Sequence, residues 1–490
     1  MGLQLAHLYA APEVNPVNRK ARAIPFFNPV NVYGRVFFFS WFGFMIAFWA
    51  WYTFPPLLTH TIKYDLNLSP AEVANSNIVS LLATLLVRVT AGPLCDQFGP
   101  RKVFGGLLLV GAIPLGLAPL VQNITGLYVS RFFIGILGGS FVPCQVWSTG
   151  FFDKNVVGTA NALTGGFGNA GGGITYFIMP AVYDAFVASG RSPGQSWRLT
   201  FIIPLVMVLA TGTALLLLCP DTPTGKWADR HRQAEENLHA HGIDDVIVDI
   251  PGAITDRLPS TPPDNEEKID LKEERKTSIA FDHEAQLSKT EMIQTAQGEI
   301  VQKPTLREAL LVARSPQTIF HILTYSCSFG SELAINAILA SYYSKNFPHL
   351  GQTASANWAA MFGFLNFITR PLGGIVSDIL YNYFGRSLWL KKIWIVVCGA
   401  VTGVLLMVIG FLDPKSEGVM FGLVALMAIF LEAGNGANFS LVPHVHPFAN
   451  GILSGLTGAG GIWEGWCLRW CLGLWMGGGG MRGGFGLLGL

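Results

Sequence analysis

The sequence predicts an all-helical, polytopic membrane protein built from two related halves. Of its 490 residues, 51% are hydrophobic and only 13% are charged, whereas soluble proteins usually carry about 25% charged residues. The charges are also concentrated, because 19 acidic and 12 basic residues lie within 221–315, leaving the rest of the chain about 8% charged. Too few charges remain to cover a water-facing surface, so a soluble enzyme is excluded.

Apolar segments long enough to cross a bilayer recur along the chain. A spanning helix needs about 20 mostly apolar residues. Ahead of the charged segment, such runs lie at 36–58, 75–95, 103–122, 126–150, 161–186 and 199–219. After it they lie at 317–343, 356–380, 391–412 and 417–442, and an eleventh begins near Gly451. The sequence therefore predicts ten or eleven spans.

Basic residues orient these spans. Arg101, Lys102, Lys154 and Arg386 all fall in loops on one side, and the positive-inside rule makes that side cytoplasmic. The predicted organisation is a cytoplasmic N-terminal segment, a six-helix bundle, a cytoplasmic and largely disordered linker, an incomplete second bundle, and an atypical Gly/Trp-rich tail. In order, these units occupy 1–35, 36–219, 220–316, 317–462 and 463–490.

An internal repeat supports the two-halves prediction. Arg88-x3-Gly92-x3-Asp96 recurs 282 residues later as Arg370-x3-Gly374-x3-Asp378. A second pattern, Gly-x4-Leu-Thr-Gly, begins at Gly158 and recurs at Gly451. Repetition on either side of a hydrophilic loop is typical of secondary transporters, which hold substrate near the midplane between their repeats. This architecture disfavours a channel.

The first repeat resembles the loop motif of the major facilitator superfamily, Gly-x3-Asp-x2-Gly-x-Arg-Lys. The matching residues are Gly92, Asp96, Gly99, Arg101 and Lys102. The resemblance implies that fold, with 12 spans expected in the family, and a gate in which salt bridges latch the two halves. Gly374 and Asp378 occupy the equivalent positions of the second half. The motif indicates fold and gating but carries no information about substrate.

Arg88 and Arg370 are the strongest candidates for substrate-binding residues. Each lies two helical turns inside the membrane from its gate aspartate, among apolar neighbours. An intramembrane arginine costs several kcal/mol unless it is paired, which makes it a functional candidate. One alternative is a structural ion pair with Glu332 or Glu432, the carboxylates well inside spans. The favoured alternative is an anion clamp, because guanidinium offers planar, bidentate donors to oxyanions.

A glycine-rich run lies in the fifth span. A literal Gly-x-Gly-x-x-Gly is present in it, but no strand precedes it, so a dinucleotide site is excluded. In a membrane helix such residues allow close packing. Asn169 within the run either satisfies a neighbouring backbone group or donates to the anion. The candidate packing glycines are Gly165, Gly166, Gly168, Gly171, Gly172 and Gly173.

The tract 141–173 and the arginine pair are similar to the nitrate/nitrite porter family, and the long central loop is similar to its fungal branch. The resemblance implies a plasma-membrane, proton-coupled, high-affinity nitrate transporter that also takes nitrite and serves nitrate assimilation. It further implies that Arg88 and Arg370 bind the anion. The family's signature asparagine corresponds to Asn169, and its aromatic residues around the ion correspond to Phe141, Tyr325 and Phe329.

Taken alone, those aromatic side chains would be interpreted as core packing. Glu332 and Glu432 are candidates for proton coupling, and no residue constellation suggests a metal, a cofactor or a catalytic site. Nucleic acid is not an expected partner at a net charge of +1. We expect a monomer in a lipid bilayer. The alternatives are transport of another small anion, or a truncated, non-transporting sensor.

The sequence departs from the family after Gly461. The second half should repeat the signature asparagine, but the position that matches Asn169 is Ile462, and the tail that follows is rich in glycine and tryptophan. We interpret this as truncation or mis-splicing of a longer frame. As written, the chain is expected to lack the twelfth span and most of the eleventh.

Overall fold

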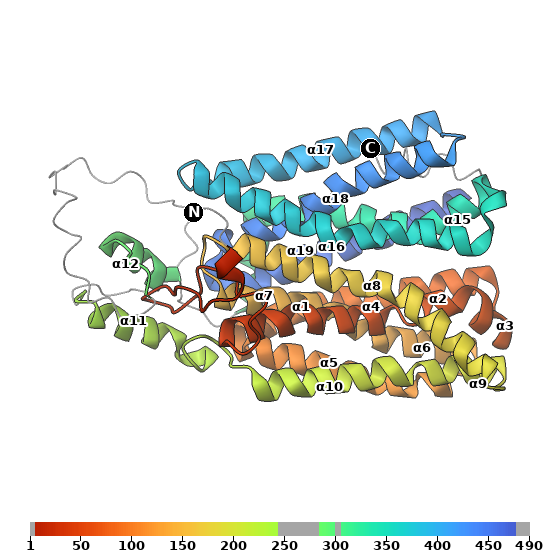
Figure 1. Cartoon of the computed structure of the whole chain (residues 1–490), viewed down its shortest axis with the longest axis horizontal. Coiled ribbons are helices and arrows are strands. Elements are labelled where there is room, and N and C mark those ends of the chain that lie inside the picture. Colours follow the sequence, from red (N-terminus) through yellow and green to blue (C-terminus); the bar gives the residue numbers. More distant parts are fainter. Residues whose placement is uncertain (1–4, 244–283, 299–304, 477–490) are drawn as a thin grey trace.

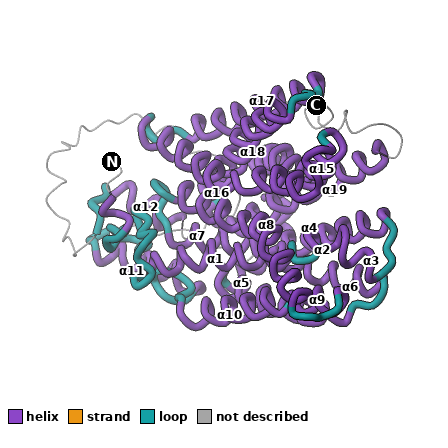
Figure 2. Tube along the Cα trace, turned by 45° about the vertical axis from the view of Figure 1, so that its right-hand side comes forward, coloured by secondary structure: helices purple, strands orange, loops and turns teal. Residues whose placement is uncertain are grey.

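The computed structural model describes residues 5–243, 284–298 and 305–476, and its described elements are helical (Figure 1). Two bundles lie side by side with their helices roughly parallel to the long axis of the molecule, one red to yellow and the other green to blue. The N-terminal segment and the linker helices gather at one end, which we call the linker end (Figures 1 and 2). The predicted all-helical fold is confirmed.

The first bundle contains six helical paths, each a helix or a run of consecutive helices that crosses the bundle. They correspond to the six predicted spans and are formed by α1, α4, α5, α6–α7, α8 and α10. Short segments connect them at the end opposite the linker. The elements are η1 Leu5–Leu8, α1 Val32–Trp51, α2 Pro55–Leu57, η2 Leu58–Ile62, α3 Lys63–Asp65, α4 Pro70–Phe98, α5 Pro100–Leu117, η3 Ala118–Leu120, α6 Ile124–Ile134, η4 Gly135–Ser140, α7 Phe141–Phe151, α8 Val157–Ala188, α9 Pro193–Thr200 and α10 Ile202–Leu218.

The second bundle contains five further paths, of which the first runs through α14, η7 and α15. A π-helical segment, η7, interrupts that path, and such bulges are frequent at functional sites. The elements are α14 Pro316–Tyr325, η7 Ser326–Gly330, α15 Ser331–Asn346, η8 Pro348–Leu350, α16 Gly351–Tyr383, α17 Leu388–Leu412, α18 Glu417–Val445, η9 Pro447–Ala449 and α19 Asn450–Met476.

Eight helices of the described part are long and apolar enough to cross a membrane by length and composition. The helix α8, the α14–α15 path and α19 are not among the eight. These three carry many glycine and polar residues, which lower their mean hydropathy. Their place inside the two bundles shows why that composition is tolerated, since packed neighbours, not lipid, surround their polar faces.

The described part of the linker forms short helices. It contains η5 Trp227–Asp229, α11 Arg230–Ala240, α12 Lys289–Gly298 and α13 Leu306–Arg314. A small apolar cluster joins the N-terminal segment to α11 and α12 through Val17, Leu238 and Met292. Residues 244–283 and 299–304 lie outside the described residues, so the prediction of a largely disordered linker stays a prediction.

The eleventh path also differs from the sequence expectation. Helical structure does not end near Gly461, because α19 continues to Met476. Ile462, at the position of the expected asparagine, is fully buried in the large apolar cluster that spans both halves. The helix persists because residues 463–476 contain no proline and few glycines. Residues 477–490 of the predicted tail lie outside the described residues.

The two halves pack against each other through helices that carry the repeated motifs. Helix α19 of the second half lies on α4 of the first, and α8 of the first half lies on α16 of the second. A Cβ on Gly92 would lie 2.4 Å from the backbone oxygen of Gly451, and one on Gly374 would lie 2.2 Å from the Cβ of Ala162. Each motif glycine thus permits a close contact between the two halves.

Adjacent glycines of α8 give a matched test of this packing. A Cβ on Gly171 would lie 2.1 Å from the backbone oxygen of Met45, whereas one on Gly172 would meet the Tyr52 ring at an ordinary 3.6 Å. Both Gly→Ala changes gain about 1 kcal/mol of helix propensity. We expect Gly171→Ala to lower the melting temperature in detergent, because overpacking costs about 1–3 kcal/mol, and Gly172→Ala to leave it unchanged or raise it. Equal melting temperatures for the two variants would contradict this packing.

Candidate functional site

Arg88 on α4 is fully buried at the boundary between the two halves. Its Nε donates to the carbonyl of Gly138 at 3.1 Å, in the first half, and its Nη1 donates to the carbonyl of Gly458 at 3.0 Å, in the second. The remaining terminal nitrogen, Nη2, is buried and has no hydrogen-bond partner among the described residues. Arg88 therefore keeps a donor available for a ligand.

Arg370 on α16 is the equivalent residue of the second half, with 2% of its surface exposed. Its Nη1 donates to Oδ1 of Asn366 at 3.3 Å, and its Nη2 donates to the hydroxyl of Tyr325 at 3.0 Å. The four hydrogen bonds of the two guanidinium groups thus go to neutral oxygens. The alternative of direct structural ion pairs with Glu332 or Glu432 is not what the described contacts show.

Aromatic rings bring the two arginines to one place. The ring centroid of Phe329 lies 5.3 Å from Cζ of Arg88 and 5.5 Å from Cζ of Arg370. Tyr325 stacks on Phe329 at 5.1 Å, and Phe141 stacks on Tyr325 at 6.2 Å and lies 4.9 Å from Cζ of Arg88. The faces of these rings attract cations. The rings therefore hold two positive groups around one buried centre.

Each arginine packs against a glycine of the Gly-x4-Leu-Thr-Gly pattern. The nearest side-chain atoms of Arg370 lie 3.6 Å from the place of a Cβ on Gly165, and those of Arg88 lie 3.4 Å from the place of one on Gly458. Each arginine thus passes over a glycine of the opposite half. In the fifth span, Gly166, Gly168 and Gly171 face neighbours closer than 3.0 Å, whereas Gly172 and Gly173 have only ordinary contacts.

The Asn169 side chain bonds to its own helix. Its amide donates to the carbonyl of Gly165 at 2.7 Å, and the residue is 8% exposed. The structure thus shows the first of the two sequence interpretations, in which the amide satisfies a backbone group. The amide could reach an anion only after giving up this bond.

Several residues of the site were missed by sequence reasoning. Phe439 on α18 packs its ring edge-on against Phe141 at 4.6 Å and Tyr325 at 4.9 Å. Gln145, one turn after Phe141, is buried with its Oε1 unpartnered among the described residues. Asn366 lies one helical turn before Arg370. That spacing, an amide four residues from an intramembrane arginine, is the signal that could have found Asn366.

The two gate aspartates bind helix N-termini of the opposite half at the linker end. Oδ1 and Oδ2 of Asp96 accept from the backbone N–H groups of Gly451 and Ile452, each at 3.0 Å, in the first turn of α19. Asp378 accepts from the backbone N–H of Thr159 at 2.6 Å, in the first turn of α8. A carboxylate at a helix N-terminus is favoured by unpaired N–H groups and by the helix dipole.

The gate differs from the salt-bridge latch implied by the motif. Arg101 and Lys102 pair with Asp221 at the start of the linker, directly after α10, at 2.6 and 3.9 Å, and so do not bridge the halves. Asp378 forms a buried ion pair with Lys391 of its own half, whose Nζ lies 2.7 Å from its Oδ1. Backbone amides supply the contacts that cross between the halves at Asp96. Gly99, with φ +91°, makes the turn that follows α4.

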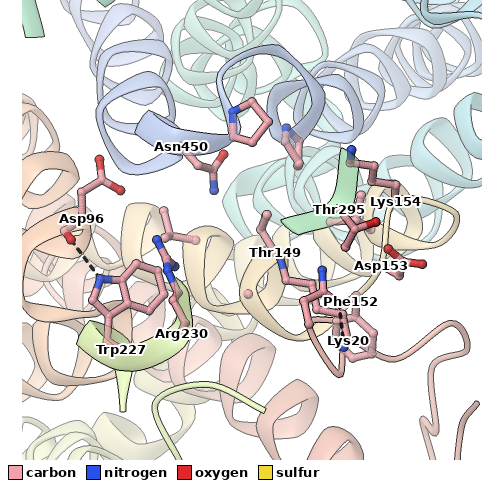
Figure 3. Close-up of a pocket in the computed structure, with 16 residues that line it drawn as sticks. Lys20, Asp96, Thr149, Phe152, Asp153, Lys154, Trp227, Arg230, Thr295 and Asn450 are labelled. Atoms are coloured by element: carbon pink, nitrogen blue, oxygen red, sulfur yellow. Dashed lines mark hydrogen bonds between the residues drawn. The ribbon is translucent and has the colours of Figure 1, made fainter. Parts of the chain in front are cut away.

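The linker covers this closed end. Figure 3 shows Trp227 beside Asp96, with its indole Nε1 donating to the Asp96 carbonyl at 2.9 Å. Arg230 of α11 stacks on the same indole, 3.6 Å from the ring centroid to Cζ. Lys20, Lys154 and Asn450 line the same pocket from the N-terminal segment and both halves. The linker therefore contacts the groups that must separate if this end opens.

A second linker contact reaches the other half. Glu291 on α12 forms an ion pair with Arg386, in the loop between α16 and α17. This hydrogen bond raises the pKa of Arg386 above its ordinary value. The linker thus contacts both halves at the closed end, through Trp227 on one and Glu291 on the other. Within the described residues no group of three or more metal-ligating side chains is present.

Comparisons with known proteins agree with this architecture. The family profile of the Major Facilitator Superfamily matches residues 40–463. Elsinochrome transporter 1 of Elsinoe fawcettii is 33% identical over 94% of this chain and 91% of its own length. High-affinity nitrate transporter 2.3 of Oryza sativa is 30% identical over 91% of this chain and 73% of its own length. The nitrate/nitrite transporter NrtP of Nostoc punctiforme is 27% identical over 88% of this chain and 85% of its own length.

Solved structures match at the level of the fold. The proton:xylose symporter XylE of E. coli matches with a TM-score of 0.62 at 13% identity, covering 93% of this chain and 92% of that one. The transporter FucP of E. coli, in its outward conformation, matches with a TM-score of 0.57 at 14% identity, covering 92% and 95%.

The Asp96 contact can be tested through a native thiol. Cys95 is fully buried beside it. An asparagine has one acceptor oxygen where Asp96 uses two, so Asp96→Asn should weaken the bond to α19 and open the linker end. In a background with the other six cysteines replaced by serine, we expect faster maleimide labelling of Cys95. Asp221→Asn is the matched control, because the ion pairs of Asp221 do not bridge the halves. Equal labelling in both variants would refute the latch.

Proposed function

The chain belongs to the Major Facilitator Superfamily and is a secondary transporter, and from that premise we propose that it imports nitrate, and also nitrite, together with protons. We place it in the plasma membrane with the linker end in the cytoplasm, as the loop charges indicate. One observation carries the proposal. Arg88 and Arg370 are two buried cations on one aromatic ring, and their described hydrogen bonds go to neutral oxygens.

The charge of the site favours an anion. A buried charge costs several kcal/mol unless it is compensated, and here two cations lie together with no carboxylate among their described hydrogen-bond partners. A monoanion between them would supply the missing negative charge and accept from the unpartnered Nη2 of Arg88. The Tyr325 hydroxyl accepts from Arg370, which leaves its own hydrogen able to donate to the same ion.

The shape of the site favours a small, planar ion. Phe141, Tyr325 and Phe329 stack with interplanar angles of 14° and ring centroids 5.1 and 6.2 Å apart. Such packing leaves little height for a bulky substrate. Nitrate is flat, and each guanidinium group presents donors in a plane that suits a planar oxyanion. Nitrate transporters of rice and Arabidopsis are about 30% identical to this chain over nine tenths of its length, which supports the same assignment.

Alternating access would follow from the gate geometry. With the linker end closed, the anion enters from the other side and bridges the two arginines. Neutralising their repulsion lets the halves approach there, and the same rocking motion separates Asp96 from α19 and Asp378 from α8. Moving one negative charge inward against the membrane potential costs about 2.3 kcal/mol per 100 mV. Two protons carried with each nitrate would make the cycle inward-positive and therefore favourable.

A second candidate is transport of a substrate other than nitrate, since a relative named elsinochrome transporter 1 is 33% identical to this chain. Uptake competition separates the two. Labelled nitrate uptake that nitrite and chlorate reduce, and that elsinochrome does not, supports the nitrate assignment, and failure of nitrate to be taken up or to compete excludes it. Nitrate binding without flux would instead support a non-transporting sensor.

Removal of either arginine should abolish high-affinity uptake. We expect Arg88→Ala and Arg370→Ala to lose saturable nitrate uptake at low substrate concentration, because each removes one of the two charges that the anion bridges. Lysine at either position keeps the charge but loses the planar donors, so partial activity is expected. Initial rates in cells are the measurement, with surface expression as the control. Unchanged uptake in both alanine variants would exclude the clamp.

Tyr325→Phe should raise KM more than it lowers the maximal rate. The variant keeps the stacked ring but loses a hydroxyl that bonds Arg370 and faces the proposed anion. A hydrogen bond to a charged group is worth about 1.5–3 kcal/mol, so KM should rise roughly tenfold or more. Phe329→Leu provides the comparison, since it removes a ring without removing a donor. An unchanged KM in Tyr325→Phe would show that the hydroxyl does not contact the ion.

A further inference from the structure

Two buried carboxylates of the second half meet at a single amide. Nδ2 of Asn366 lies 2.7 Å from Oε1 of Glu332 and 3.4 Å from Oε1 of Glu432. Glu332 is 4% exposed and Glu432 is fully buried. The same asparagine accepts from Nη1 of Arg370 through its oxygen. One side chain therefore connects both carboxylates to an arginine of the proposed anion site.

Glu432 accepts hydrogen bonds from neutral donors. The Thr369 hydroxyl donates to Oε2 of Glu432 at 2.5 Å and also lies 2.8 Å from the carbonyl of Leu365, one turn earlier in α16. The Asn366 amide reaches the other carboxyl oxygen. The described hydrogen bonds of Glu432 thus include no cation, so a negative charge on this group is poorly compensated.

Glu332 has the surroundings of an ionised partner. Its two oxygens accept from the amide groups of Asn366 and Asn435, each at 2.7 Å. The oxygen of Asn435 accepts in turn from Ser328 at 2.6 Å, which fixes the direction of that amide. Two carboxylates that share one site cannot both ionise at low cost. A single negative charge and a single proton on the pair is therefore the arrangement of lower cost.

Few other charged groups face the pair. Arg370 of α16 and Tyr325 at the end of α14 lie on the side of the carboxylate pair that faces the anion site. On α19, the side chain of Glu464 packs against Gly330. From α17, Cys398 lies against Gly434. The first half has no counterpart, because the residue four positions before Arg88 is Thr84, whose hydroxyl bonds the backbone oxygen of Gly135 at 2.7 Å. The carboxylate pair is thus specific to the second half.

We propose that Glu332 and Glu432 form a shared proton site, and that Asn366 is the positioning residue that couples it to the anion on Arg370. The inference rests on the proposed anion transport. An anion on Arg370 cancels part of the positive charge that favours ionised carboxylates, so it makes protonation of the pair easier. By linkage, protonation of the pair makes the centre more positive and strengthens anion binding by the same factor. Proton and anion therefore load together.

Coupled binding predicts a pH-dependent affinity. In proteoliposomes of the full chain, labelled nitrate counterflow measures anion exchange without any need for net proton movement. We expect the apparent nitrate affinity of the wild type to fall as pH rises, by roughly 5- to 150-fold in total, the usual range of such coupling. Asn366→Leu also removes an acceptor of Arg370, so counterflow should weaken, and the counterflow that remains should lose most of that pH dependence. Thr84→Val, at the equivalent place in the first half, should keep it.

A second variant tests the proton itself. Glu432→Gln mimics the protonated acid, so counterflow should persist while accumulation driven by a proton gradient is lost. Infrared spectra of the purified wild-type protein at neutral pH should show the C=O stretch of a protonated carboxylic acid that Glu432→Gln removes. Proton-driven accumulation by Glu432→Gln, or wild-type pH dependence in Asn366→Leu, overturns the inference.

The infrared arm separates this inference from the proposed function. If the wild type binds no nitrate, the nitrate assignment fails, but the band of the protonated acid still tests the pair. The band, lost on Glu432→Gln, supports the shared proton whatever anion Arg370 binds. No difference between the two spectra overturns the shared proton even if nitrate is transported.

Discussion

Two positive charges buried side by side, with neutral hydrogen-bond partners, constrain the centre of this molecule. Desolvation makes each of them expensive, and mutual repulsion adds to the cost. Neutral groups around the two arginines offset this cost. Arg88 donates to carbonyl oxygens, Arg370 donates to amide and hydroxyl oxygens, and the rings of Phe141 and Phe329 lie against the guanidinium groups. These neutral groups stabilise the cations without cancelling their charge. The centre consequently retains an attraction for an anion that a salt bridge would have removed.

The repeat explains how such a centre can be assembled from the chain. Arg88 and Gly458 meet across one interface of the halves, and Arg370 and Gly165 meet across the other, so each half supplies one cation and one glycine that packs against the cation of the other half. The same crossing recurs at the linker end, where Asp96 binds α19 and Asp378 binds α8. Centre and gate lie on the same two helix pairs. In the proposed mechanism, neutralising the arginines would therefore change the spacing at the gate.

The sequence predicted much of this because its signals are local and periodic. Apolar runs located the helices, and the repeat located both arginines, both aspartates and the glycines opposite them. It could not show that Asn169 bonds its own helix or that Asp96 binds backbone amides, since both depend on how helices far apart in the chain face each other. The length of α19 was missed for another reason. Glycine and tryptophan in 463–476 lower its resemblance to a typical span, but inside a packed bundle they remain compatible with a helix.

The departures from symmetry indicate which half carries which task. Asp378 has Lys391 as a buried counter-ion, whereas Asp96 bonds the N-terminus of α19. The carboxylate pair also belongs to the second half alone among the described residues. The first half therefore contributes an arginine with an open donor and a gate bond made to backbone amides. The second contributes the polar network of Asn366, Glu332 and Glu432. An anion that bridges Arg88 and Arg370 would join these two environments, and its charge would be felt at both.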